Sequence, residues 1–422
     1  MAAEPANDDP SEVDELVGDL GLAMLAAGYA VTDVGSTLTA VARAHGRDSM
    51  TVGAIPTAIL IDDPQTQRAR IAGMAPGTMY RFDQTRLVGT IAGEATARQS
   101  PPAAIRRRLA AVAGLPPPYP AWVTMLGNAL VAAGVSVVFR TTWLAVAVDF
   151  LLGLLVGVVL EWTARAPRLM SLMPFALGFV ASAVVFAVAH GLHVPGAPLF
   201  SVFAPIVVLV PGAAITNSVI ELAAGDVVSG GGRLIGGLIT WMMLLLGILL
   251  GAAANGASLT ELVLRPPDAL PAWAAWPGLL VMGIGIAMSN CAPPKLAVVV
   301  VVVLFLTYAI LVLVGSTTNS IVGSGAAAAA MLVLTRLLEQ RRRDLPAIVT
   351  FRPAFWLLVP GSMGLASLTL FAGADRGSAQ SLLFTMGATV IAISIGVQVG
   401  AAISEAIGWR WPGQRAGIGT SP

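Results

Sequence analysis

The residues of this 422-residue chain that could bind a polar ligand gather around a proline–glycine pair in apolar sequence. Proline removes a backbone donor and clashes with the preceding turn, so the pair predicts a break in a helix. Backbone groups freed at a break in a membrane helix can bind the carboxylate and ammonium of an amino acid. The candidate binding residues in and after this pair are Pro211, Gly212, Thr216, Asn217, Glu221 and Asp226.

A second pair, Pro360-Gly361, lies 149 residues further along the chain, and its surroundings resemble those of the first pair. Both stretches read Phe-x-Pro, several apolar residues and then Leu-Val-Pro-Gly, beginning at Phe203 and at Phe351. The recurrence predicts an internal repeat and makes Pro360 and Gly361 candidate binding residues as well. Two packing kinks that bind no ligand are the alternative interpretation.

Two polar residues in other apolar stretches are candidates for coupling transport to an ion. Asp149 stands among valine, alanine, phenylalanine and leucine residues, and a carboxylate inside a membrane is costly and usually functional. Asn290 lies near the end of a later apolar stretch. A carboxylate that reaches water at a helix end is the alternative interpretation of Asp149.

The composition predicts that apolar helices position these residues. The chain is 56% hydrophobic and 11% charged, with a mean hydropathy of +0.81, whereas a soluble domain carries about 25% charged residues. Nearly half of the charged residues lie in 1–110, which predicts a soluble domain followed by a membrane domain. Residues 1–15 are acidic and predict no signal peptide, and the single Cys291 excludes an intrachain disulfide or a multi-cysteine metal site.

We predict that residues 1–115 form a small soluble α/β domain. One helix is expected to begin at Ser11, where Ser11 and Asp14 fit a capping box, and another to run from about residue 32 to a stop at Gly46. The other predicted elements are strands at 50–52, 57–61 and 69–72, helices at 86–98 and 102–113, and a stiff proline-rich linker at 116–120.

Ten apolar stretches follow, each long enough to cross a bilayer as a helix. They lie at 121–139, 142–161, 172–190, 199–220, 234–254, 275–292, 296–315, 320–338, 350–373 and 383–404. Two halves of five spans that share a fold must face opposite ways, which is the inverted-repeat architecture of many secondary transporters. The predicted segments are a first repeat at 116–255, an extracytoplasmic loop at 256–274, a second repeat at 275–408 and a tail at 409–422. Arginines gather on the side of the first domain, which predicts that both termini are cytoplasmic.

The sequence resembles the threonine/serine exporter family in three places. The most specific is 209–233, which contains Leu-Val-Pro-Gly-Ala-Ala-Ile-Thr-Asn-Ser-Val-Ile-Glu-Leu-Ala-Ala-Gly-Asp. The others are 22–34 with the later Ile55-Pro56-Thr57, and 345–349 with the Leu-Val-Pro-Gly-Ser that follows. The resemblance implies a ten-span inner-membrane exporter of threonine and serine, driven by the proton gradient, with a cytoplasmic N-terminal domain.

One stretch departs from the family pattern. Asp33-Val34-Gly35 stands where the family usually has an Arg-Val-Glu-like triplet, so a role of that glutamate does not carry over to this chain. The resemblance also covers relatives that export small dicarboxylates, which leaves the substrate open.

These observations predict a secondary transporter, rather than an enzyme, that exports small hydroxylated amino acids across the bacterial inner membrane. An exporter of small dicarboxylates and a passive channel are the alternatives. A membrane hydrolase is disfavoured, because Ser36 and His45 would lie about 13 Å apart along one helix. The chain has no ATP-hydrolysing motif, so by elimination the proton is the expected coupling ion. We expect no cofactor and no nucleic-acid partner, and whether the protein forms a homo-oligomer in the bilayer is open.

Overall fold

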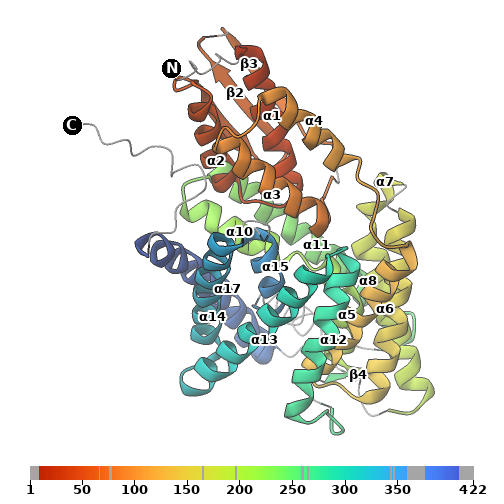
Figure 1. Cartoon of the computed structure of the whole chain (residues 1–422). Coiled ribbons are helices and arrows are strands. Elements are labelled where there is room, and N and C mark those ends of the chain that lie inside the picture. The colour runs from red at the N-terminus through yellow and green to blue at the C-terminus, as the bar shows by residue number, and fades with distance from the viewer. Residues whose placement is uncertain are drawn as a thin grey trace.

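The computed structural model describes residues 9–65, 67–75, 78–163, 166–194, 197–257, 261–263, 266–342, 345, 347–358 and 376–407. Residues 10–113 pack four helices against a three-stranded sheet, and we call this part the N-terminal unit (Figure 1). Its helices are α1 (Pro10–Ala26), α2 (Val31–Ala44), α3 (Phe82–Thr96) and α4 (Pro102–Ala113). Its strands β1 (Thr51–Ile55), β2 (Ala58–Asp63) and β3 (Arg68–Gly73) pair antiparallel in that order.

The three predicted strands are confirmed. Ile59 and Ile61 of β2 are buried in the core of the unit, whereas Leu60 between them is exposed. Gly21 of α1 permits the contact, because a Cβ there would lie 2.6 Å from the Ile59 side chain. Helix α2 ends before Gly46, whose φ of +76° suits a glycine.

The predicted capping box at the first helix is wrong. The helix begins one residue earlier, at Pro10, and its cap is Asp9, whose carboxylate accepts the Ser11 N–H at 2.9 Å. Proline is favoured in the first turn because its missing N–H would be unpaired there in any case. Asp14, the other half of the predicted box, is buried in the unit instead.

Eight of the described helices are long and apolar enough to cross a membrane, so the protein is a multi-pass membrane protein. The first half contributes α5 (Ala121–Val138), α6 (Trp143–Thr163), α8 (Met173–Gly191) and α11 (Val227–Ala253). The second half contributes α12 (Ala275–Ser289), α13 (Pro294–Thr317), α14 (Ser320–Arg341) and α17 (Arg376–Ala406). Ten spans were predicted, and the two that these helices do not match are those containing the proline–glycine pairs.

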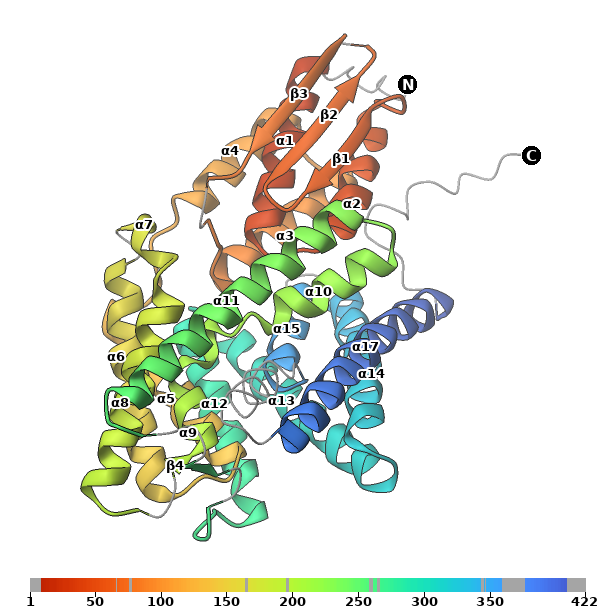
Figure 2. The same ribbon diagram turned by 180° about the vertical axis from the view of Figure 1, so that it is seen from behind.

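The predicted span at 199–220 is a broken helix rather than a continuous one. It consists of α9 (Leu199–Phe203), the 3-10 helix η1 (Ala204–Leu209) and, after Val210 and Pro211, α10 (Gly212–Ala223). Figure 2 shows α10 alongside α11 and beneath α2. In the second half, α15 (Ala347–Leu358) covers the start of the predicted span at 350–373, and Pro360 and Gly361 lie outside the described residues.

Short elements connect the spans. They are α7 (Pro167–Met170), the 3-10 helix η3 (Ala272–Ala274), and the strands β4 (Ala197–Pro198) and β5 (Leu262–Val263), which pair in parallel. The strand pair joins the loop after α8 to the predicted loop at 256–274. It lies at the end of the molecule opposite the N-terminal unit (Figure 2).

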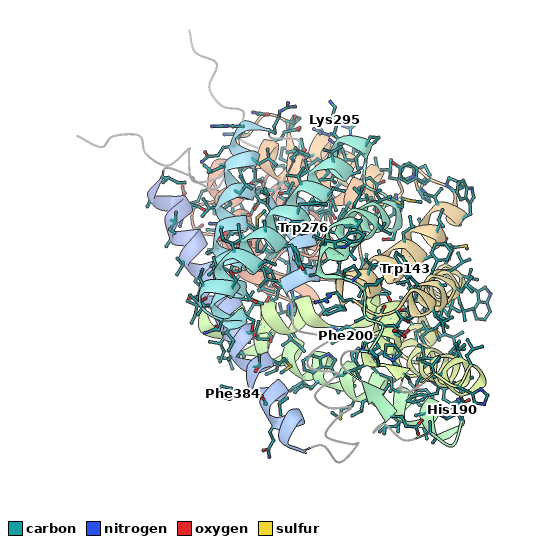
Figure 3. All side chains as sticks on the ribbon, turned by 90° about the horizontal axis from the view of Figure 1, so that it is seen from below. Trp143, His190, Phe200, Trp276, Lys295 and Phe384 are labelled. Atoms are coloured by element: carbon teal, nitrogen blue, oxygen red, sulfur yellow. The ribbon has the colours of Figure 1, made fainter. Side chains whose placement is uncertain are left out.

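Exposed tryptophans mark the two ends of the membrane-crossing helices. Trp122 and Trp162 are each 63% exposed at the end next to the N-terminal unit, and Trp143 and Trp273 are similarly exposed at the other end. Figure 3 looks onto that other end and labels Trp143. Trp143 and Trp162 bracket α6 and lie about 28 Å apart along its axis, close to the thickness of a hydrocarbon core. Tryptophan prefers the membrane–water interface, so α6 fits a bilayer at this depth.

The two halves meet where α5 packs against α12. A Cβ on Gly127 would lie 2.5 Å from the backbone nitrogen of Ser289, and a Cβ on Gly134 would lie 2.5 Å from that of Met282. A Cβ on Gly285 would come equally close to the backbone of Val131. Residue numbers rise along α5 as they fall along α12, so the two helices run antiparallel. Small residues let membrane helices approach closely, because packing rather than hydrophobicity drives their association.

We expect Gly134→Ala to lower the temperature of thermal unfolding in detergent. The added methyl has no room beside Met282, and overpacking costs about 1–3 kcal/mol. Gly236→Ala on α11 is the matched control, because nothing lies within 4 Å of a Cβ there. It should leave stability unchanged or raise it, since alanine is the better helix former. Equal effects of the two substitutions would contradict the close contact between α5 and α12.

Candidate functional site

The structure places the predicted binding residues on either side of the helix break. Pro211 lies between η1 and α10 and faces Gly237 of α11, and the Gly212 N–H donates to the Val210 carbonyl at 2.8 Å. Asn217 is half-buried on α10, and Asp226 is half-buried in the turn before α11. The side chain of Thr216 lies outside the described residues.

Asp149 lies on α6, where it meets the helix that leads to the break. Its side chain is fully buried, and Ser201 of α9 donates a hydrogen bond to its Oδ1 at 2.5 Å. Ser136 of α5 lies near the same carboxyl group, but no described group hydrogen-bonds to the buried Oδ2. The alternative interpretation, in which Asp149 reaches water at a helix end, is therefore wrong.

Glu221 connects the broken helix to the N-terminal unit. It is fully buried at the end of α10, with its Oε1 3.1 Å from Arg233 Nε of α11. The backbone N–H of Val31, the first residue of α2, donates to the same oxygen at 3.4 Å. The Glu221–Arg233 ion pair thus fixes the turn between α10 and α11, and the hydrogen bond from Val31 holds this turn against the N-terminal unit. Asp226 lies within this turn, and no ion pair of Asp226 occurs among the described residues.

Two charged residues of α14 also act electrostatically on this contact between the N-terminal unit and the membrane helices. Burial raises the pKa of Asp33 on α2, and Arg336 of α14 opposes the shift. Burial also raises the pKa of Tyr29, with further contributions from Glu339 of α14 and from Asp33. The start of α2 thus hydrogen-bonds to α10 and lies within electrostatic range of α14, so it is near both halves of the membrane part.

A cavity of about 800 Å³ lies between the N-terminal unit and the membrane helices, and we call it the junction cavity. Arg81, just before α3, and residues 117–120 of the linker line it from one side. Helices α5, α6 and η1 and the loop after α12 line the rest, through Thr124, Asn128, Gly157, Leu160, Glu161, Val208, Ser289, Asn290 and Cys291. The cavity therefore extends from the N-terminal unit to the 3-10 helix that precedes the break at Pro211.

Asn290 lies in the wall of this cavity, at the C-terminal cap of α12 rather than inside a span. Its carbonyl accepts the Phe82 N–H of the N-terminal unit at 2.9 Å, and its side-chain amide donates to the Ile286 carbonyl at 3.0 Å. Burial raises the pKa of the neighbouring Cys291 thiol; Arg81 opposes this shift, whereas Asp83 and Glu161 add to it. Charges of both signs thus lie around one corner of the cavity.

Sequence reasoning missed Arg81, Asn128 and Glu161. They are distant in sequence, and the packing of α3, α5 and α6 brings them to one cavity. Asn128 and Glu161 could have been identified from the sequence as candidate site residues, because each is a polar residue in a long apolar helix. Nothing in the sequence distinguished Arg81 from the other arginines of the first 110 residues.

The residues considered for a hydrolase are not assembled for that chemistry. Ser36 is exposed on α2, and its hydroxyl donates to the Asp33 carbonyl at 3.0 Å, one turn earlier. His45 is buried just beyond the end of the same helix. The regular geometry of α2 keeps the two side chains apart, as the sequence predicted.

Residues 15–255 match a family model described as "Putative threonine/serine exporter". The match covers more than half of the chain and includes the N-terminal unit, the broken helix and the Glu221–Arg233 pair. The chain belongs to the threonine/serine exporter family. No curated protein and no solved structure matches it.

In this exporter-family chain, we expect Glu221 and Arg233 to stabilise the fold as a pair. Glu221→Ala and Arg233→Ala should each lower the unfolding temperature, because the first leaves the half-buried Arg233 without its partner and the second leaves the buried Glu221 without one. The double variant should lose less stability than the two single variants lose together, and the difference is a coupling energy of about 0.5–3 kcal/mol. Asp268→Ala, exposed in the loop between the two halves, is the control and should show no coupling to Arg233→Ala. Strictly additive effects of Glu221→Ala and Arg233→Ala would show that the contact carries no energy.

Proposed function

We propose that this protein exports threonine and serine by secondary transport driven by the proton gradient. Membership of the threonine/serine exporter family is the observation that carries the proposal. The junction cavity supports it, because it offers polar side chains to a substrate between the N-terminal unit and the broken helix. A free helix end at Pro211 provides backbone groups for the next step across the membrane.

Asp149 is the proposed proton-binding group. A buried carboxylate without a cationic partner is costly, and binding a proton removes that cost. The hydrogen bond from Ser201 links Asp149 of α6 to α9, the first segment of the broken helix. A change in protonation at Asp149 would therefore act directly on the element that leads to the break.

The two halves are proposed to be inverted repeats. Glycines in the last span of each half support this, because a Cβ on Gly247 or Gly251 of α11 would clash with the α8 backbone. Gly396 and Gly400 of α17 stand in the same relation to α14, and each follows its counterpart by 149 residues. Both helix pairs run parallel, whereas α5 and α12 run antiparallel. Alternating access by two opposed halves needs this arrangement.

The proposed orientation places the N-terminal unit and both termini in the cytoplasm, with the protein in the bacterial inner membrane. The start of α11 and the end of α14 lie toward the N-terminal unit (Figures 1 and 2). Arg233 belongs to the first half of α11, Arg336 to the last two turns of α14, and Lys295 to the first turn of α13, after the loop that binds Phe82. The positive-inside rule favours this side as the cytoplasmic one. The proposed segments remain a soluble domain at 1–115, repeats at 116–255 and 275–408, a loop at 256–274 and a tail at 409–422.

Efflux from cells tests the substrate. Cells lacking or expressing the protein are loaded with a threonine-containing dipeptide, and extracellular threonine is followed with and without an uncoupler. We expect expression to raise the efflux rate several-fold and the uncoupler to remove the increase. An increase that survives the uncoupler would indicate a passive channel. No increase for threonine or serine, with the protein present in the membrane, would contradict the substrate and direct the assay to small dicarboxylates.

Asp149→Asn tests the coupling in purified protein reconstituted into vesicles. The variant keeps the shape of the side chain but cannot bind and release a proton as a carboxyl group does, so a pH gradient should no longer accelerate threonine transport. Exchange of threonine across the membrane at equal pH should persist. Glu261→Gln, at the far end of the molecule beside His190, is the matched control and should keep the response to the gradient. A full pH response in Asp149→Asn would rule out this carboxyl as the coupling group.

A further inference from the structure

The junction cavity has a cation and an anion in its wall. Among the described residues that line it, Arg81 and Glu161 are charged, and the polar neutral ones include Thr124, Asn128, Ser289 and Asn290. Its volume of about 800 Å³ falls within the range of about 300–1,000 Å³ found for small-molecule sites. A single charge of each sign in one cavity matches a ligand that also carries one charge of each sign.

Arg81 is held in place by the N-terminal unit. Its Nε and Nη2 donate to the two carboxylate oxygens of Asp83 at 3.1 Å, and Nη2 also donates to the Leu115 carbonyl at 3.0 Å. No described group accepts a hydrogen bond from Nη1. A fixed guanidinium with donors to spare is suited to bind a carboxylate.

Glu161 lies in the last turn of α6, on the membrane side of the cavity. The negative end of a helix disfavours a carboxylate at this position, so Glu161 is not there for the stability of α6. Its Oε2 accepts a long hydrogen bond of 3.4 Å from Thr124 of α5. A carboxylate held only loosely by protein can bind an ammonium group that enters the cavity.

The two charged residues share a neighbour in the cavity wall. Arg81 and Glu161 both act on the Cys291 thiol, which also lines the cavity. Asn128 and Ser289 line the same space from α5 and α12. The Asn128 side-chain nitrogen donates to the Thr124 carbonyl at 2.9 Å, which leaves its oxygen to accept from a ligand hydroxyl.

We propose that the junction cavity binds a zwitterionic α-amino acid, with Arg81 on its carboxylate and Glu161 on its ammonium group. The inference rests on the proposed function and deepens it, because the N-terminal unit then supplies part of the substrate site. The proposed arrangement of charges also discriminates between substrates. A dicarboxylate would bring its second negative charge to Glu161, and this repulsion disfavours it.

A single thiol in the cavity tests the proposal on the full chain. Cys291→Ser removes the one cysteine of the chain, and Ser289→Cys then places a thiol in the cavity wall. Threonine should slow the reaction of this thiol with a maleimide in purified protein. The methyl ester of threonine lacks the carboxylate, and the matching hydroxy acid lacks the ammonium group. Each should need at least about tenfold higher concentration, because each loses a charge-assisted hydrogen bond.

Two variants test which charged residue of the cavity binds which charged group of threonine. Glu161→Gln should weaken protection by threonine but not by the hydroxy acid, so the preference between these ligands is lost. Arg81→Lys should weaken protection by threonine but not by its methyl ester. Asp62→Asn, exposed on β2, is the matched control and should change neither preference. A merely structural role of Arg81 or Glu161 would weaken all ligands alike.

The results separate this inference from the proposed function. A thiol placed by Ser316→Cys, about 33 Å away along α13, should react at the same rate with or without threonine. Equal protection of the Ser289→Cys thiol by threonine and by a small dicarboxylate would overturn the inference. Threonine efflux from cells without any protection of that thiol would also overturn it, while leaving the proposed function intact. Absence of threonine efflux would refute the proposed function itself.

Discussion

The contact between α5 and α12 is the constraint on which the arrangement of the other parts depends. Gly127, Gly134 and Gly285 leave no room for a Cβ, so the two helices can approach only along this line of glycines. Helix α5 begins where the linker from the N-terminal unit ends, and α12 ends at Ser289, just before its cap Asn290. Their antiparallel packing therefore brings the start of one half and the first loop of the other to the same place.

The position of the N-terminal unit and the walls of the junction cavity follow from that contact. The Phe82 N–H binds the Asn290 carbonyl, and the Tyr119 hydroxyl of the linker binds the Ala292 carbonyl at 3.0 Å. These bonds attach the unit to the loop after α12, on one side of the cavity. On the other side of the unit, Val31 binds Glu221 of α10. The unit is thus attached to both halves, and a movement between the halves would change both attachments.

The sequence predicted the elements that depend on local rules and missed those that depend on packing. Apolar stretches of about 20 residues identify spans because the bilayer requires backbone hydrogen bonds to be satisfied within each helix. Pro211 predicted the break because the missing donor is a property of the residue itself. The strand around Ile59 was predicted from a short run of residues that favour strands, whereas the cap at Asp9 depended on how Pro10 starts the helix.

No local rule of this kind predicted the contacts between residues that are distant in sequence. Glu221 was a candidate for the ligand site, but its nearest cation, Arg233, comes from the next helix after a turn. Nothing in the sequence predicted that Arg81 and Glu161 would line one cavity, because they are 80 residues apart and lie in different parts of the molecule. The 149-residue offset between the proline–glycine pairs was visible in sequence. The glycines of α11 and α17 repeat it, but their common role depends on the backbone that each meets.

Coupling between a proton and a substrate requires one element that both ligands bias. In the proposed mechanism this element is the segment formed by α9 and η1. Ser201 at one end binds the carboxyl group of Asp149, and Val208 near the other end lines the junction cavity. A 3-10 helix has poorer hydrogen-bond geometry than an α-helix, so η1 can rearrange at lower cost than the long spans around it. The eight residues from Ser201 to Val208 then connect the proton site to the substrate site, and no longer pathway through the bundle is needed.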